Sequence, residues 1–286
     1  MEKLHIITVA THSQYYFPYL VESVKRHGKN LEVLGFNEKW LGYNWKFKKM
    51  LSHLTTLPDD DIACFMDGYD VLCLRNLDEL TNKFIEIKNR TNCKMIVSGY
   101  GTTNEVVTLF SRLNSILGHM FFGKCNNTFL NSGLYIGYVK DLIIIISNIM
   151  EINNKDDADD QVLLTKYCTK NCDDIYIDDN CELFLNIYAA LKELSKYVDI
   201  HNNKIKYNNN YPFFIHACGG GYLDDTLIKL NYTLDKSIND ELYDNHFKKK
   251  IPVYIKIIIK SYYKQIIGII LIFFIIYKLK KHSYNI

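Results

Sequence analysis

Hydrophobic and polar positions alternate along the chain in the manner of short strands separated by helices. Apolar runs bounded by polar residues predict buried strands, and apolar residues spaced three and four apart predict helices between them. In chain order the pattern predicts a strand at 4–10, a helix at 16–27, a strand at 31–36, a helix at 44–57, a strand at 62–66, a helix at 77–88 and a strand at 94–98. This order predicts an α/β protein whose mostly parallel sheet is covered by helices on both faces.

The second half of the chain continues the pattern less regularly. Loop and strand are expected over 121–138, a helix over 141–153, and a further helix from the stretch DQVLLTKY at 160–167. Within the first of these regions, Asn131-Ser132-Gly133 predicts a tight polar turn between two apolar segments. We interpret residues 1–233 as one large domain and the polar stretch 234–260 as a linker.

The C-terminal segment has a different character. From Gln265 to Tyr277 the chain carries no charge, and lysines flank this run on both sides. The run is shorter than the ~20 residues that cross a bilayer, but it lengthens if Ser261–Tyr263 join it and the lysines reach toward the interface. The pattern therefore predicts a hydrophobic C-terminal helix at 261–281 that anchors the chain in a membrane as a single pass. A buried core helix is the alternative, and the side of the membrane that holds the main domain stays open.

Composition narrows the class of protein. Lysine and arginine total 34 against 32 acids, and this balance argues against a nucleic-acid binder that relies on bulk charge. The N-terminus enters a predicted strand directly, without the pattern of a secretory signal peptide. The eight cysteines show no zinc-binding spacing, and Cys64, Cys73 and Cys218 stand in apolar or motif contexts that suit core thiols. Free thiols of this kind favour a reducing compartment. A disulfide among Cys168, Cys172 and Cys181 is the alternative for a luminal domain.

Two carboxylates stand directly after a predicted buried strand, in the stretch FMDGYDVL. Asp67 and Asp70 fall at the carboxyl end of the strand, where open α/β sheets bind their ligands. A buried acid must be paired or must bind a cation, and carboxylate oxygens suit magnesium or manganese. The alternative is a plain turn in which Asp67 caps a helix, since two acids at this spacing are common.

Two further stretches carry groups that fit the same chemistry. KDDADDQVLL, at 155–164, crowds acids that repel one another unless a cation or a basic partner offsets them; the alternative is a solvated loop in which Asp159 or Asp160 caps a helix. FFIHACGGGY, at 213–222, delivers His216 to a glycine-rich bend, where a neutral imidazole can bind a metal. A lone histidine after an apolar run is more often structural.

The order of the stretches ITVAT, DGYDV, LNSGLYIG, DDQ and IHACG resembles the glycosyltransferase domain of the multifunctional procollagen lysyl hydroxylases and its viral relatives. The resemblance covers about 4–225 and includes LGFNEKW and IDDNCELFLNI. It implies a GT-A fold, which is a Rossmann-like mixed and mostly parallel sheet that binds a UDP-sugar with Mn²⁺. It also implies a stand-alone transferase, because the hydroxylase domains of that family have no counterpart in this sequence.

The resemblance carries individual roles onto this chain. The implied metal ligands are Asp67, Asp70 and His216. The implied nucleotide contacts are the strand end at Val9, Ala10 and Thr11, together with Trp40, Lys46, Tyr69 and Gly219. The implied sugar and acceptor residues are Asp159, Asp160, Gln161 and Asn131. Two positions depart from the family pattern, since Tyr222 stands where a lysine is expected near the phosphates and Ala158 interrupts the acidic run.

These residues and the resemblance together predict a metal-dependent transferase that moves a hexose from a UDP-sugar to an acceptor hydroxyl, and the resemblance implies galactose or glucose as that hexose. By resemblance the acceptor is hydroxylysine of a collagen-like protein. An inverting reaction needs a general base, for which Asp159 and Asp160 are the candidates; in a retaining reaction the same acid positions the acceptor or stabilises positive charge. The alternatives are a transferase for another glycan or protein, and a membrane-anchored protein that binds nucleotide sugars without turnover.

Overall fold

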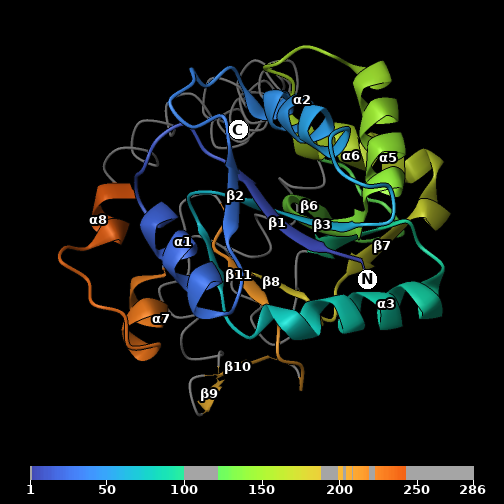
Figure 1. The fold of residues 1–286 in the computed structure, drawn as a ribbon. Coiled ribbons are helices and arrows are strands. Elements are labelled where there is room, and N and C mark those ends of the chain that lie inside the picture. Colours follow the sequence, from blue (N-terminus) through green and yellow to red (C-terminus); the bar gives the residue numbers. More distant parts are fainter. Residues whose placement is uncertain are drawn as a thin grey trace, which may run out of the picture. The chain divides into compact units, whose positions relative to one another are not determined.

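The computed structural model describes residues 2–99, 122–187, 199–201, 204–207, 209–218 and 223–242 (Figure 1). The chain divides into two units, Met1–Asn239 and Asp240–Ile286. The first unit is built on a six-stranded sheet with the order β2-β1-β3-β6-β5-β7. Its strands are β1 (Leu4–Val9), β2 (Leu31–Leu34), β3 (Ile62–Asp67), β5 (Met95–Gly99), β6 (Leu130–Tyr138) and β7 (Ile175–Asp178).

Two smaller sheets and the helices complete the described elements. The three-stranded sheet has the order β4-β11-β8, with β4 (Val71–Cys73), β8 (Phe184–Asn186) and β11 (Phe214–His216), and β9 (Asp199–His201) pairs with β10 (Lys204–Lys206). The α-helices are α1 (Phe17–Arg26), α2 (Tyr43–Leu54), α3 (Leu80–Thr91), α5 (Val139–Ile152), α6 (Asp160–Lys170), α7 (Asp224–Lys229) and α8 (Ile238–Leu242). Short 3-10 turns lie at Leu77–Glu79 and Cys172–Asp174.

The expected mixed and mostly parallel sheet is confirmed. β1 pairs in parallel with β2 and β3, and β5 pairs in parallel with β7. Only β6, among the strands of this sheet, runs against its neighbours. In the β1–β3 pair Val9 lies opposite Asp67, so both strands reach the site at the same edge of the sheet.

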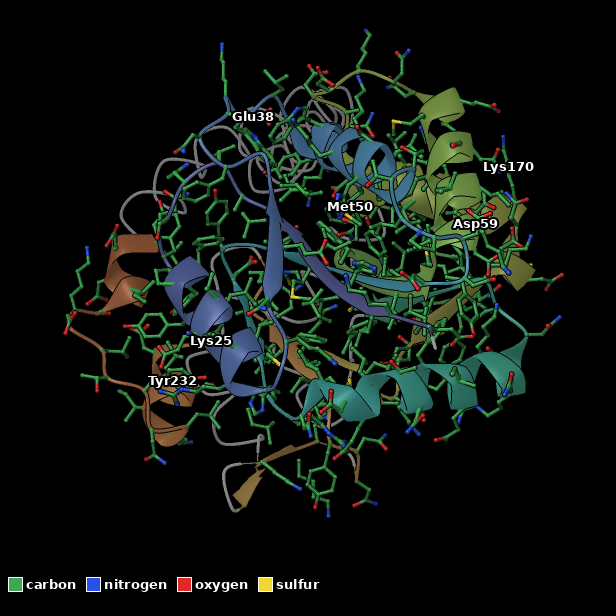
Figure 2. The ribbon with its side chains drawn as sticks, in the orientation of Figure 1. Lys25, Glu38, Met50, Asp59, Lys170 and Tyr232 are labelled. Atoms are coloured by element: carbon green, nitrogen blue, oxygen red, sulfur yellow. A yellow bond between two sulfur atoms is a disulfide. The ribbon has the colours of Figure 1, made fainter. Side chains whose placement is uncertain are left out.

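Helices cover both faces of the sheet, as the alternating pattern predicts. One apolar cluster joins the sheet to α2, α5 and α6, and the other joins it to α1, α3 and the three-stranded sheet. Figure 2 shows the side chains that fill these two layers. Alternate residues of β3 divide between the clusters, with Phe65 in the first and Cys64 and Met66 in the second.

Two local expectations were wrong. Asn131-Ser132-Gly133 is not a turn but part of β6, where a register shift between Val97 and Ser98 of β5 accommodates the polar residues. Cys168 does form a disulfide, but its partner is Cys125, with their Cα atoms 5.9 Å apart. Cys172 is exposed on the turn after α6 and is free, as is the buried Cys181.

The predicted anchor at 261–281 lies outside the described residues, as does most of the predicted linker. The described start of that linker contains α8. Within the part of the chain that the structure describes, no helix combines the length and the apolar character needed to cross a membrane.

Candidate active site

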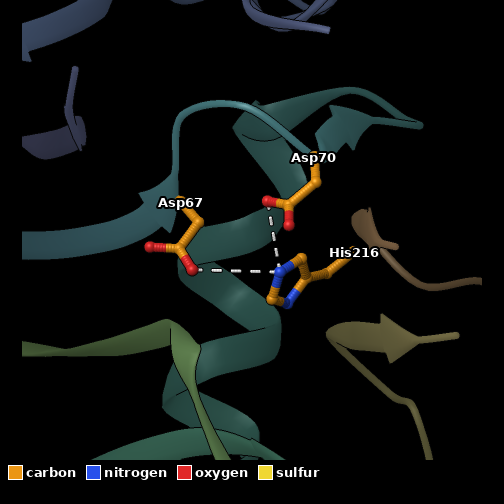
Figure 3. A group of neighbouring side chains, drawn as sticks. All are labelled: Asp67, Asp70 and His216. Carbon is orange, nitrogen blue, oxygen red and sulfur yellow. Dashed lines mark ion pairs between the residues drawn. The ribbon is translucent and has the colours of Figure 1, made fainter. Parts of the chain in front are cut away.

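Three predicted ligands converge where β3 ends. Asp67 is the last residue of β3, Asp70 lies in the turn before β4, and His216 ends β11 (Figure 3). The Nε2 atom of His216 lies 3.3 Å from Oδ1 of Asp70 and 3.9 Å from Oδ2 of Asp67. One ligand atom from each residue falls within 4.8 Å of the others, so two carboxylates and an imidazole can share one cation.

The small sheet brings His216 to the aspartates. β11 pairs antiparallel with β4, which places His216 opposite Val71, and the backbone N–H of Ala217 donates to the carbonyl of Asp70. The imidazole is buried, and its Nδ1 atom has no hydrogen-bond partner among the described residues. Burial opposes a charge on His216, but attraction to Asp70 and then to Asp67 outweighs burial and raises the His216 pKa.

Gly133 gives the imidazole its space. A Cβ atom at this position would lie 2.4 Å from Cε1 of His216 and 2.7 Å from Oδ2 of Asp67. Both distances are far below van der Waals contact, so any side chain here would displace a candidate ligand. The glycine of the Asn-Ser-Gly stretch is therefore required by the close approach of β6 to the three ligands.

Lys46 links the candidate metal ligands to the acidic stretch. Its Nζ atom lies 2.6 Å from Oδ1 of Asp67 and 2.9 Å from Oδ2 of Asp160. Lys46 and Asp160 are both buried. Burial opposes the charge on Lys46, but attraction to Asp160 and Asp67 outweighs it and holds the Lys46 pKa above its usual value.

The two adjacent acids of the DDQ stretch differ in their surroundings. Asp159 is exposed and caps α6, because its Oδ1 atom accepts the backbone N–H of Val162 at 2.9 Å. Asp160 is the first residue of α6 and turns inward to Lys46. The helix-capping alternative therefore describes Asp159. Asp160 instead belongs to a charged centre that it forms with Lys46, Asp67, Asp70 and His216.

Asn131 lies beside the candidate ligands on β6. Its Oδ1 atom accepts the backbone N–H of Gly133 at 2.9 Å, and its Nδ2 atom faces Oε1 of Gln161 at 3.4 Å. The Nε2 group of Gln161 is buried and makes no hydrogen bond within the described part of the chain. An unpaired buried amide next to a charged site is a candidate donor for a polar ligand.

Three of the predicted nucleotide residues, Val9, Thr11 and Tyr69, lie at the ends of β1 and β3. The backbone N–H of Thr11 donates to the Tyr69 hydroxyl at 2.9 Å, which ties the segment after Val9 to the turn between the aspartates. Trp40 is 39% exposed and packs edge-on against Tyr43 and Trp45. Gly219 and Tyr222 lie outside the described residues.

The chain matches the model of one protein family over most of its length. The model of the family described as "PLOD GT domain" matches residues 1–241. The chain belongs to the PLOD GT domain family. Its charged centre therefore lies in a glycosyltransferase domain, as the resemblance implied.

Relatives of this PLOD GT domain occur in an animal and in a virus. A procollagen-lysine,2-oxoglutarate 5-dioxygenase of Drosophila melanogaster is 26% identical over 240 residues, covering 78% of this chain and 31% of the relative. An uncharacterized protein of Acanthamoeba polyphaga mimivirus is 26% identical over 203 residues, covering 68% of this chain and 41% of that protein. The chain thus spans well under half of the length of these relatives.

A solved structure of a glycosyltransferase involved in the glycosylation of the major capsid of PBCV-1 is also similar. It shares 13% identity, covers 76% of this chain and 93% of its own, and has a TM-score of 0.48.

Sequence reasoning missed several residues that support the site of this PLOD GT domain. Asn186 lies opposite His216 in the β8–β11 pair, and its amide donates to Oγ of Ser98 and to the carbonyl of Gly99 at 3.0 and 2.8 Å. Asp178 accepts the backbone N–H groups of Glu182, Leu183 and Phe184, which lie just before and at the start of β8, at 2.8 to 2.9 Å. Burial raises the Asp178 pKa to about 6, although these hydrogen bonds oppose the rise. Asp178 stands in the IDDNCELFLNI stretch, so the resemblance could have drawn attention to it.

Proposed function

We propose that this PLOD GT domain is a metal-dependent glycosyltransferase that moves a hexose, galactose or glucose, from a UDP-sugar to an acceptor hydroxyl. The observation that carries the proposal is the convergence of Asp67, Asp70 and His216 at the edge of the sheet, next to the end of β1. The donor set suits a divalent cation, and we propose Mn²⁺. When bound, the cation would offset the charge of the leaving diphosphate as a Lewis acid.

The end of β1 and the loop between β2 and α2, which carries Trp40, provide a surface for the nucleoside. The Tyr69 hydroxyl fixes the backbone of Thr11. Trp40 offers a partly exposed ring on the loop that follows β2, and the backbone N–H of Asn37 ties that loop to the carbonyl of Thr11. A flat base can stack on such a ring while backbone groups bind its polar edge. These contacts support UDP as the nucleotide part of the donor.

Asp160 is the acid that we place at the sugar. Its Oδ2 atom already accepts a hydrogen bond from the Lys46 ammonium, which fixes the position of the carboxylate. A fixed negative charge at this position favours an electrostatic role. We therefore propose that Asp160 stabilises positive charge at the anomeric carbon, while the amides of Asn131 and Gln161 position sugar or acceptor hydroxyls.

The acceptor is proposed from a relative, and the location from the C-terminal sequence. The Drosophila relative is named for procollagen lysine, so we propose hydroxylysine of a collagen-like protein as acceptor. We also propose that 261–281 anchors the chain in a membrane; recovery of the full chain in the soluble fraction after membranes are pelleted would contradict this.

One experiment tests the proposed activity. The full chain is incubated with Mn²⁺ and a panel of UDP-sugars, and UDP release is followed with and without a hydroxylysine-bearing collagen peptide. Release that disappears with EDTA, and in Asp67→Ala and Asp160→Ala, establishes the transferase and identifies its sugar. UDP binding without release from any donor would instead mean a protein that binds nucleotide sugars, in keeping with the departure at Tyr222.

A further inference from the structure

One buried asparagine joins two loops that lie far apart in the sequence. Asn44 has no exposed surface, and its Nδ2 group donates to the carbonyls of Asn153 and Lys155, both at 2.9 Å. Its backbone N–H donates to the carbonyls of Asp156 and Ala158, both at 3.1 Å. The side-chain amide and the backbone N–H of this residue thus bind four carbonyls of the segment 153–158, which connects α5 to α6.

These bonds replace the usual cap of a helix. The first backbone N–H groups of an α-helix have no partner within the helix, and α2 has no side-chain cap at its N-terminus. The backbone N–H groups of Asn44 and Trp45 donate instead to the 153–158 segment. The start of α2 therefore depends on the 153–158 segment for its hydrogen-bond acceptors, and that segment depends on Asn44 for its position.

A second observation shows how close the two loops lie. Gly42 precedes α2 with φ of 140°, and a Cβ atom there would lie 2.3 Å from the carbonyl oxygen of Asp156. Only glycine combines this backbone conformation with this approach. The Nζ atom of Lys48 also contacts Oδ1 of Asp156 at 2.6 Å, from the next turn of α2.

The contact lies directly beside the Lys46–Asp160 ion pair. Lys46 follows Asn44 by two positions on α2, and Asp160 follows Ala158 by two positions at the start of α6. The clamped residues thus set the distance between the two helix starts that carry the charged groups. By contrast, Asp67, Asp70 and His216 lie on β3, the following turn and β11, which Asn44 does not contact through any hydrogen bond between described residues.

We propose that Asn44 is a positioning residue, which clamps 153–158 onto α2 and thereby keeps Lys46 and Asp160 in contact. Its effect on catalysis rests on the proposed function, whereas its effect on the ion pair does not. Loss of the clamp should free α6 to move away from α2, expose the Lys46 amine and remove Asp160 from the sugar site. Binding of metal and UDP should change little.

The test variant is Asn44→Asp, which keeps the shape of the side chain but replaces the donating amide by an acceptor. The matched control is Asn82→Asp, the same change at an exposed position of α3. Lys48→Ala is a milder second variant, since it removes only the partly exposed ion pair with Asp156.

The first arm measures the ion pair without turnover. Each protein is treated briefly with an acetylating reagent, and acetylation of Lys46 is quantified by peptide mass spectrometry against Lys140, whose side chain is half exposed. We expect Asn44→Asp to raise the relative acetylation of Lys46 by about fivefold or more, Lys48→Ala to raise it less, and Asn82→Asp to leave it unchanged. Unchanged acetylation of Lys46 in Asn44→Asp would overturn the proposal.

The second arm measures transfer. We expect Asn44→Asp to lower kcat by about tenfold or more, with UDP affinity within about twofold of the unaltered protein and no further loss in an Asp160→Asn background. Additive losses with Asp160→Asn, or a parallel loss of UDP affinity, would show a merely structural role and overturn the proposal. Absence of transfer in the unaltered chain would reject the proposed function, while the acetylation arm would still decide the clamp.

Discussion

Replacing Gly133 by alanine should impair metal-dependent nucleotide binding more than it impairs folding. The added methyl group would lie 2.4 Å from Cε1 of His216, 2.7 Å from Oδ2 of Asp67 and 2.9 Å from Oδ1 of Asn131. Two of these three neighbours are candidate metal ligands. A methyl group at this position of β6 would therefore disturb the candidate metal ligands directly.

The size of the effect follows from the distances. Carbon atoms make favourable contact at about 3.5–4.0 Å, so the imidazole or the strand must move by roughly 1 Å. Overpacking of this kind lowers the free energy of unfolding by about 1–3 kcal/mol. Disturbance of residues that orient metal ligands lowers metal affinity by about 10- to 100-fold. We expect a loss of that size in the affinity for Mn²⁺ and UDP together.

Gly137→Ala supplies the matched control, because Gly137 lies on the same strand and is also too crowded for a Cβ atom. A Cβ atom there would lie 2.8 Å from the carbonyl oxygen of Lys94 and 2.9 Å from Leu142, away from the ligands. Calorimetric titration with Mn²⁺ and UDP, beside urea unfolding of each variant, separates the two effects. The reasoning is refuted if Gly133→Ala binds as the unaltered chain does, or if Gly137→Ala loses as much affinity.

Three further predictions concern stability. Lys46→Met should lower the free energy of unfolding by about 3–5 kcal/mol, because Asp160 is left buried without its cationic partner. Adding Asp160→Asn should restore more than half of the lost free energy, and a double variant as unstable in urea as the single one would contradict this. Reduction of the Cys125–Cys168 disulfide, which closes a separation of 43 residues, should lower it by about 4 kcal/mol; coincident urea curves with and without reductant would be the contrary result. The Asp61 pKa is lowered, because burial raises it but hydrogen bonds from a backbone N–H and an imidazole outweigh burial. Its contribution to stability is therefore present above about pH 4, the unfolded value, and is lost as pH falls through the folded pKa; Asp61→Asn should flatten this acid limb in urea unfolding between about pH 5 and 2, and parallel limbs would disprove it.

The elements of the fold were largely predictable because their periodicity is local. The strand predicted at 62–66 is β3, Ile62–Asp67, and the helix predicted at 44–57 is α2, Tyr43–Leu54. The direction of β6 was not predictable, since an apolar strand reads the same whether its partners run parallel or antiparallel. The Cys125–Cys168 disulfide was also not predictable, because the two cysteines meet only when α6 packs beside the segment before β6.

The ligands of the candidate site were predictable by resemblance, but their supports were not. Asp67, Asp70 and His216 stand in short stretches whose order along the chain is informative. Asn44 makes its hydrogen bonds to backbone carbonyls, which any residue offers, so no partner residue signals them in the sequence. Gly133 matters through the distance between β6 and β11, which only the packed structure defines.

Asp67 connects the two halves of the charged centre. Its Oδ1 atom is paired with Lys46, while its Oδ2 atom faces His216 across the candidate metal position. Asp70 adds a second carboxylate at that position, whereas Asp160 meets the same ammonium from the start of α6. Lys46 therefore joins the candidate metal ligands to the acidic stretch, with Asp67 on the ligand side of the ammonium and Asp160 on the α6 side.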